Sequence, residues 1–411
     1  MISFRRCVIL AVSLLSFTFI LHLSTGSNAH QQPKPSDLLE KEPSGLDKSR
    51  ERQLFQIPLE DLAQKPLRER LRYQFPYDLQ SKFPAYIWQT WKYAPSSGHF
   101  GEELRPFEAS WTEAHPGFVH QVVTDAGMIY VIKYLYAAFP EIIEAFESMP
   151  LPVLKADFFR YLILLARGGI YTDIDTWALK SAIEWVPKSV DRSSIGLVIG
   201  IEADPDREDW QDWYSRRIQF CQWTIQSKPG HPILRDVVAN ITEEALRMKS
   251  HGRLKKAKMD KTIVEFTGPA VWTDAVFRYL NNPAYFDVGN DIHLTREIDY
   301  RYFVGIVAQK VVGDVIVLPI TSFSPGVQQM GAQEPEHPMA FVKHEFQVRA
   351  SEEFIFRDSD RLSERYPLIP SSFCIDLSGE SMLSTFREFY FVFPFFPAQR
   401  KGKNWSTFKE F

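Results

Sequence analysis

Two kinds of hydrophobic pattern follow one another along residues 84–318. Apolar residues three and four positions apart predict helices, which we place at 103–114, 126–137, 141–149, 232–248 and 269–280. Short apolar or alternating runs predict strands, which we place at 84–91, 118–124, 169–172, 195–201, 220–226 and 315–318. Helices that separate strands at this spacing are typical of an α/β domain with a mainly parallel sheet.

The most informative segment is residues 151–180, LPVLKADFFRYLILLARGGIYTDIDTWALK. It opens with apolar residues at helical spacing. Gly168-Gly169 then predicts the end of the helix, because glycine readily adopts the left-handed conformation that ends one. Residues 169–172 predict a short strand that runs into Asp173-Ile174-Asp175.

Asp173 and Asp175 are candidate metal ligands. In an extended chain they project to the same face, where two carboxylates can hold one hard divalent cation. They also follow a strand, and open α/β sheets bind ligands at the carboxyl ends of their strands. An Asp-x-Asp triplet alone arises by chance in many chains, but helix, glycine pair, strand and acid pair in this fixed order are far more specific.

Asp157 and Arg160 lie three residues apart on the predicted helix and therefore share a face. One interpretation is an ordinary helical ion pair. The other is that this face leans toward the end of the strand, which would aim an acid and a cation near Asp173 and Asp175. The sequence leaves both open.

The N-terminal segment predicts entry into the secretory pathway. Residues 1–6 are short and basic, and residues 7–23 are apolar and uncharged. We interpret them as a cytoplasmic tail and a transmembrane signal anchor, with Arg5 and Arg6 keeping the N-terminus cytosolic. The alternative is a signal peptide that is cleaved near residues 27–29. Both interpretations place the rest of the chain in the lumen or outside the cell.

The remaining domain boundaries follow from composition. Residues 24–75 are rich in Gln, Pro, Ser, Lys and Glu, so we expect a stem with some helix near residues 59–73. We place the catalytic domain at residues 76–350. We expect residues 351–411 to form a C-terminal extension that packs on this domain or is partly disordered.

Charge and cysteine content narrow the classes of partner. The net charge of -4 gives no basic stripe, so the sequence gives no support for nucleic-acid binding. Cys221 and Cys374 could form one disulfide in an oxidising lumen, although nothing shows that they meet. The triplets that begin at Asn240 and Asn404 are glycosylation sequons and fit the same location.

Four segments together resemble a known family. The string Lys155-Ala156-Asp157-x-x-Arg160-Tyr161, followed by Gly168-Gly169-Ile170-Tyr171-x-Asp173-x-Asp175, resembles the sugar-nucleotide site of glycosyltransferase family 32. The segments at 83–92, 227–232 and 267–274 are similar to the fungal initiation-specific α-1,6-mannosyltransferases of that family. The resemblance covers roughly residues 80–346.

This resemblance implies a GT-A type, Rossmann-like α/β fold and a type II Golgi membrane enzyme. It implies GDP-mannose as donor, Mn²⁺ as cofactor and retention of the anomeric configuration. The acceptor would be the N-glycan core of glycoproteins, extended in α-1,6 linkage to initiate the outer chain. Other Golgi mannosyltransferase subunits are candidate partners.

The resemblance also assigns roles. Asp173 and Asp175 would bind the metal and, through it, the donor diphosphate, and His344 would complete the metal shell. The family often continues this histidine with a Gly-Ser-Trp-like segment, whereas this chain continues with Glu345-Phe346. Asp157 and Arg160 would hold hydroxyl groups of the donor sugar.

Two further assignments each have a structural alternative. Trp88 would flank the guanine, or it fills the core. Asp274 would contact the acceptor or stabilise charge as a catalytic residue, or it is a solvent-facing or capping residue at the start of a helix.

Three rival functions remain. One is a transferase of the same family that acts on another glycan or on a sphingolipid. Another is an inactive subunit of a Golgi mannosyltransferase complex, which the intact acid pair disfavours. A Ca²⁺-binding structural domain is disfavoured because one acid pair supplies too few ligands.

Overall fold

The computed structural model describes residues 62–205, 208–212, 214–259, 263–282, 284–285 and 297–345. Contacts divide the chain into Met1–Ser49 and Arg50–Phe411, and all the described residues belong to the second unit. The predicted anchor, most of the stem, the extension at 351–411, Cys374 and Asn404 lie outside the described residues. Within the described residues, no helix is both long enough and apolar enough to cross a membrane.

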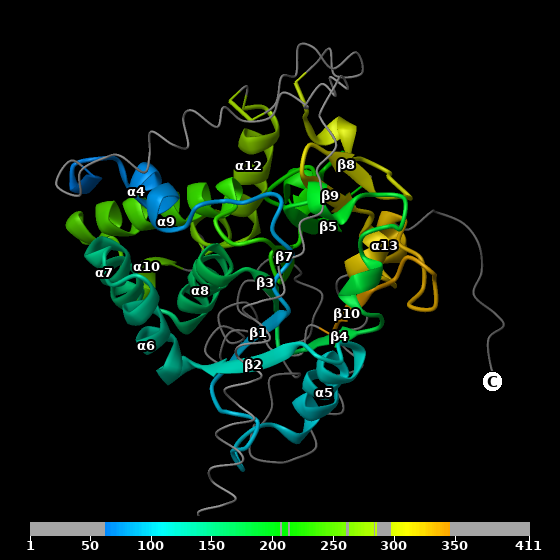
Figure 1. The fold of residues 1–411 in the computed structure, drawn as a ribbon, viewed down its shortest axis with the longest axis horizontal. Coiled ribbons are helices and arrows are strands. Elements are labelled where there is room, and N and C mark those ends of the chain that lie inside the picture. The colour runs from blue at the N-terminus through cyan, green and yellow to red at the C-terminus, as the bar shows by residue number, and fades with distance from the viewer. Residues whose placement is uncertain are drawn as a thin grey trace, which may run out of the picture. The chain divides into compact units, whose positions relative to one another are not determined.

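The described region is built on a sheet of eight strands in the order β2-β1-β3-β7-β5-β9-β8, with β6 paired to β5 (Figure 1). The strands are β1 (Tyr86–Trp91), β2 (Val119–Thr124), β3 (Gly169–Thr172), β5 (Leu197–Ala203), β6 (Gln219–Phe220), β7 (Thr224–Ser227), β8 (Lys310–Val312) and β9 (Val315–Leu318). A smaller sheet pairs β4 (Thr176–Ala178) with β10 (Val342–His344).

The strand directions confirm a mixed α/β fold with a mainly parallel sheet. β1 is parallel to β2 and β3, and β5 is parallel to β9. β7 is antiparallel to both β3 and β5, so β1, β2, β3, β5 and β9 all run in one direction. The single strand expected at 220–226 is wrong, because β6 and β7 are separate strands and residues 221–223 leave the sheet between them.

Helices cover both faces of the sheet (Figure 1). The helices are α4 (Leu67–Gln74), α5 (Arg105–Ala114), α6 (Asp125–Leu135), α7 (Pro140–Ser148), α8 (Pro152–Arg167), α9 (Pro232–Ser250), α10 (Lys256–Met259), α11 (Ile263–Phe266), α12 (Pro269–Leu280) and α13 (Ile320–Phe323). Side chains alternate between two cores along each strand. On β5, Leu197 and Ile199 join the larger core with α6 to α9 and α12, whereas Val198 joins the core beneath α5 and α13.

Helix α8 is the centre of the larger core. Every residue from Asp157 to Leu165 is buried, so the helix is covered on all sides rather than along one stripe. It ends at Gly168, which has a φ of 62°, as the glycine pair predicted. A side chain on Gly169 would place its Cβ 2.6 Å from the carbonyl oxygen of Tyr86, so only glycine allows β3 to approach β1 this closely.

The packed region begins before residue 76, where we had placed the start of the catalytic domain. Leu71 of α4 is fully buried, and α4 packs on α9. Arg68 bonds Asp236 at 2.8 Å and Glu243 at 2.8 Å, both on α9. The last part of the predicted stem is therefore part of the folded region.

The sequon at Asn240 lies on α9 beneath α4. The Asn240 side chain accepts a hydrogen bond from Arg68 and donates one to Asp236. Thr242 is buried, and its hydroxyl donates to the carbonyl of Val238 at 2.8 Å. A glycan on Asn240 would displace these contacts, so the structure argues against the predicted glycosylation at this residue.

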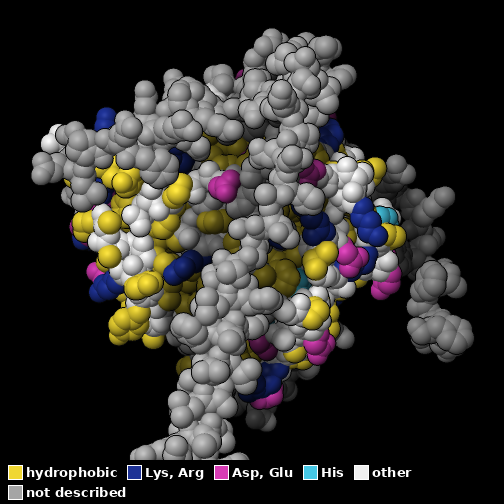
Figure 2. Space-filling model, viewed as in Figure 1, with side chains coloured by type: hydrophobic (Ala, Val, Ile, Leu, Met, Phe, Trp, Pro, Cys, Tyr) yellow, Lys and Arg dark blue, Asp and Glu magenta, His cyan; other side chains and the backbone are white. Residues whose placement is uncertain are grey.

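Charged side chains of both signs are mixed on the visible surface. On the face in Figure 2, Lys and Arg lie among Asp and Glu, and hydrophobic side chains gather over α6 and α7.

Candidate active site

The acid pair lies in a turn between β3 and β4. The backbone N–H of Asp173 donates to the carbonyl of Trp223 at 2.9 Å, and the Thr176 hydroxyl donates to the carbonyl of Asp173 at 2.6 Å. Ile174 is buried in a small apolar cluster with Phe107 and others, which anchors the turn. The extended geometry that we used to pair the two carboxylates is therefore wrong, but the turn brings them together.

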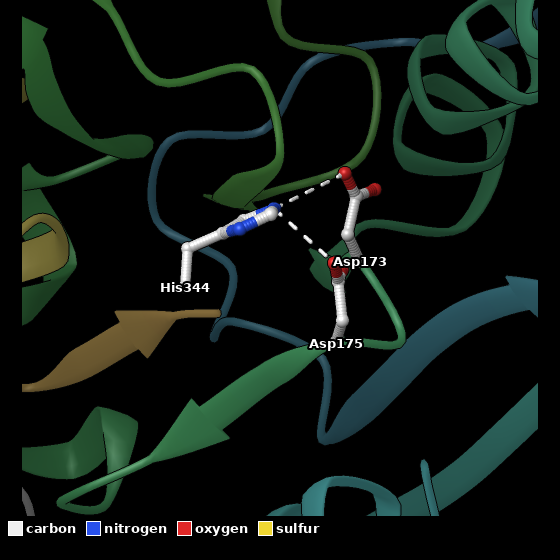
Figure 3. Close-up of side chains that lie close together, drawn as sticks. All are labelled: Asp173, Asp175 and His344. Atoms are coloured by element: carbon white, nitrogen blue, oxygen red, sulfur yellow. Dashed lines mark ion pairs between the residues drawn. The ribbon is translucent and has the colours of Figure 1, made fainter. Parts of the chain in front are cut away.

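His344 reaches the acid pair through the smaller sheet. β10 pairs antiparallel with β4, and this register sets His344 opposite Thr176, one residue after Asp175. The imidazole Nε2 lies 3.6 Å from Asp175 Oδ1 and 3.9 Å from Asp173 Oδ2. Figure 3 shows the ring directed at both carboxylates.

The cluster of Asp173, Asp175 and His344 fits a divalent cation. One ligand atom from each residue lies within 4.8 Å of the others. Ligand atoms held about 2.1 Å from one octahedral ion lie about 3 Å apart when adjacent and about 4.2 Å apart when opposite. The two imidazole–carboxylate distances fall in this interval. Carboxylate oxygen and imidazole nitrogen suit Mn²⁺ among other divalent ions.

Arg160 joins the cluster to helix α8. Its Nη2 lies 3.1 Å from Asp157 Oδ1 and 3.2 Å from Asp173 Oδ1, and its guanidinium lies over the Tyr171 ring at 5.0 Å. Burial favours the neutral acid, but Arg160 and His344 outweigh it and hold the pKa of Asp173 below its usual range. The two interpretations of Asp157 and Arg160 are thus both correct, since the helical ion pair also faces the end of β3.

The pKa of the Asp157 carboxyl shifts in the opposite direction from that of Asp173. Burial raises its pKa to about 6, although Arg160 and two neutral donors oppose the shift. Thr267 donates to Oδ2 at 2.8 Å, and Gln222 Nε2 donates to Oδ1 at 3.3 Å. Sequence reasoning gave neither donor a role, although Thr267 stands in one of the segments that carried the family resemblance.

Arg160 also offers donors for which the described residues supply no acceptor. Its Nε and Nη1 are buried, and neither has a hydrogen-bond partner within the described residues. A buried guanidinium N–H without a partner is costly, so such groups are normally satisfied by water, an ion or a ligand. These two groups therefore indicate that a polar ligand belongs beside Arg160.

The chain resembles known proteins in this same region. Residues 101–191 match the family described as a glycosyltransferase sugar-binding region containing a DXD motif. The initiation-specific α-1,6-mannosyltransferase of Candida albicans is 48% identical, over 68% of this chain and 75% of its own. The enzyme of that name in Saccharomyces cerevisiae is 35% identical, over 68% and 80%. The chain belongs to this family of glycosyltransferases.

A more distant relative names a different acceptor. The inositol phosphoceramide mannosyltransferase 3 of Schizosaccharomyces pombe is 30% identical, but over only 22% of this chain and 24% of its own.

The predicted enzyme class and family resemblance are both confirmed. A glycosyltransferase of this kind uses a nucleotide-sugar donor and a glycan acceptor.

Trp88 of the transferase is not brought to the acid pair. Its indole Nε1 donates to the carbonyl of Gly168 at 2.9 Å, and its ring stacks on Tyr86 and packs against the larger core. Gly168 precedes β3, whereas Asp173 follows it, so the indole reaches toward the opposite end of that strand. The geometry supports the core interpretation of Trp88 over guanine binding.

Asp274 is held in a surface ion pair. Arg216 donates from Nε to Oδ1 at 2.8 Å and from Nη2 to Oδ2 at 2.7 Å, and the same guanidinium binds Glu265. Asp274 lies inside α12 rather than at its start, so it does not cap the helix, but its side chain is partly exposed, as the solvent-facing alternative predicted. The ion pair ties α12 to the segment before β6 and accounts for Asp274 without a catalytic role.

Proposed function

We propose that the protein transfers mannose from GDP-mannose to N-glycan cores in α-1,6 linkage, with Mn²⁺ as cofactor and retention of configuration on a GT-A type fold. The observation that carries this proposal is the joined arrangement of Asp173, Asp175 and His344 with Asp157 and Arg160 at one edge of the sheet. The long similarity to α-1,6-mannosyltransferases supports the choice of sugar and linkage.

Different residues would bind the diphosphate and the sugar of the donor. Asp173, Asp175 and His344 would hold Mn²⁺, which neutralises charge on the leaving diphosphate. The free N–H groups of Arg160 donate to hydroxyl groups of the sugar, and Asp157 accepts from them. Thr267 and Gln222 keep the Asp157 carboxylate in one orientation, so the sugar meets a preformed site.

Arg160 fixes the sugar-binding residues relative to the metal-binding residues. Because one guanidinium nitrogen contacts both Asp157 and Asp173, the sugar-binding carboxylate and the metal-binding carboxylate are fixed relative to each other. The anomeric carbon of the sugar is bonded to the diphosphate, so this coupling orients the bond that breaks.

The test of this proposal is a donor and acceptor panel. Purified protein with Mn²⁺ would be given GDP-mannose, UDP-galactose or UDP-glucose, with either a core N-glycan or inositol phosphoceramide as acceptor. We expect product only from GDP-mannose and the N-glycan, with an α-1,6 bond by linkage analysis. Product on the ceramide alone would favour the sphingolipid alternative, and no turnover with any pair would favour an inactive subunit.

Replacing His344 with alanine is expected to raise the Mn²⁺ concentration for half-maximal activity by at least about 10-fold, because the site would lose a ligand that we assign to the metal, and even the loss of a residue that only supports a ligand costs about 10-fold to 100-fold. A Mn²⁺ titration of the transfer rate measures this change. His99→Ala alters a histidine that stacks on Tyr93 and serves as the control. An unchanged titration in the His344 variant would remove this residue from the metal site.

We further propose that the enzyme is a single-pass type II protein of the Golgi membrane with a lumenal catalytic domain. The basic residues 1–6 and the apolar residues 7–23 support this location. Protease treatment of intact Golgi vesicles should leave the catalytic domain uncut until detergent is added. Digestion without detergent would contradict the proposed orientation.

A further inference from the structure

Glu202 lies at the same edge of the sheet as the acid pair. Because β7 is antiparallel to both β3 and β5, these two strands run in the same direction and their carboxyl ends share one edge. Asp173 follows the end of β3, and Glu202 is the penultimate residue of β5. Only β7 separates the two strands in the sheet.

The pairing of β5 with β6 is irregular at Glu202. β6 pairs Phe220 with Ile201 and Gln219 with Ala203, so the register slips at the residue between them. Bulges of this kind are frequent beside active sites, where they re-aim one side chain. Glu202 is also the one residue of β5 that is partly exposed, whereas its neighbours in the strand are buried.

Trp223 contacts both Asp173 and His344 of the metal-binding cluster. The carbonyl of Trp223 accepts from the backbone of Asp173, and its ring meets the imidazole of His344 edge-on at 4.7 Å. Burial raises the pKa of Glu202, and the nearby Gln219, His344, Trp223 and Arg160 oppose this shift. The positive charges of His344 and Arg160 thus favour the ionised form of this carboxylate.

The protein fixes the orientation of Glu202 without using all its capacity. Gln219 Nε2 donates to Oε2 at 3.0 Å, and Gln219 itself is buried. A carboxylate can accept about four hydrogen bonds, so it can bind further donors. Glu202 is thus an oriented carboxylate that solvent reaches, at the same edge of the sheet as the proposed sugar-nucleotide site.

We propose that Glu202 accepts hydrogen bonds from hydroxyl groups of the acceptor glycan and so positions that sugar against the donor. The donor already has its own groups on α8, Asp157 and Arg160. Glu202 belongs to β5 and is partly exposed to solvent, from which the acceptor must enter. This inference rests on the proposed function, because it requires a glycan acceptor.

The test separates use of the acceptor from use of the donor. Glu202→Gln keeps the shape of the side chain but removes its charge. We expect kcat/KM for a core N-glycan to fall by about 10-fold to 100-fold, the range for one hydrogen bond to a charged group. The KM for GDP-mannose should change less than about twofold. The slow hydrolysis of GDP-mannose that occurs without an acceptor should also change less than about twofold.

Two companion variants keep the result interpretable. Glu147→Gln neutralises a surface glutamate that pairs with Lys133 and should match the unaltered enzyme in every assay. Glu202→Asp retains the charge but withdraws it by one methylene, so it should show the same split between acceptor and donor with a smaller loss. It provides the test if the Gln variant fails to fold.

Two outcomes would overturn the inference. An acceptor kcat/KM that stays within about twofold in both variants would show that the acceptor does not need this carboxylate. Equal losses in the rate of transfer and in the rate of GDP-mannose hydrolysis without acceptor would show that Glu202 acts on the donor instead. Failure of the proposed function looks different, since the unaltered protein would then release no GDP from GDP-mannose. The same comparison would then be made with whichever donor of the panel is used.

Discussion

Replacing Asp173 with asparagine is expected to lower the rate of transfer by about 10³-fold, while the protein still folds. Asp173 is the carboxylate that faces both Arg160 and His344, at 3.2 Å and 3.9 Å. Asparagine keeps the shape of the side chain but removes the charge that a metal requires, and electrostatic stabilisation of the leaving group is often the largest part of catalysis. The side chain is partly exposed, so the fold tolerates the change.

The Asp173 prediction is checked by GDP release from GDP-mannose and by a Mn²⁺ titration of thermal stability. Asp78→Asn, at an exposed aspartate, is the matched control and should keep full activity. In the Asp173 variant, the rise in melting temperature on adding Mn²⁺ should shrink, because a weaker ligand stabilises less. More than a tenth of the normal rate with an unchanged Mn²⁺ response would contradict the metal role.

The local features of the site could be predicted because they depend on neighbours in the sequence. The end of α8 at Gly168 follows from backbone conformation, and the shared face of Asp157 and Arg160 follows from helical periodicity. The acid pair was predicted for the wrong reason, since Asp173 and Asp175 converge through a turn rather than an extended strand.

The positions of other site residues depend on strand pairing between segments far apart in the sequence, which the hydrophobic pattern does not specify. His344 meets Asp175 because β10 pairs with β4, and nothing in the pattern of either segment specifies that register. Family resemblance was the only signal for it. Gln222 and Glu202 were missed for the same reason, because each owes its position to the way β6 and β7 insert beside β5.

Trp88 shows why the sequence leaves two interpretations of one residue open. A large aromatic residue on the first strand satisfies both a core and a base-binding interpretation, and only the direction of its indole distinguishes them. In the structure that direction is set by the carbonyl of Gly168, the residue that ends α8.

Replacing Arg160 with methionine is expected to abolish transfer and to lower the free energy of unfolding by about 3–5 kcal/mol at neutral pH. Arg160 is buried between Asp157 and Asp173, and methionine fills similar space without a charge. Removing one partner of a buried ion pair leaves the other charge uncompensated. Arg278→Met, at a half-exposed pair with Asp236, should cost no more than about 1 kcal/mol.

The cost of the Arg160 change should depend on pH in a defined direction. The pKa of Asp157 is already about 6 in the folded protein, above the ordinary value of 3.8, because of burial. Without Arg160 this pKa rises further, so the folded state takes up a proton more readily than the unfolded state does. The folded variant therefore gains stability as the pH falls through the raised pKa toward the ordinary value.

Urea unfolding at pH 7.5 and pH 5, without divalent metal, measures this dependence. We expect the deficit of the Arg160→Met variant relative to the unaltered protein to be smaller at pH 5. Adding Asp157→Asn to that variant removes the carboxylate that titrates, so it should recover part of the stability at pH 7.5 and weaken the dependence on pH. It should not recover activity, because both groups that hold the sugar are then gone. A deficit no larger than that of the Arg278→Met control, at either pH, would mean that Arg160 does not neutralise the buried Asp157 carboxylate as the geometry requires.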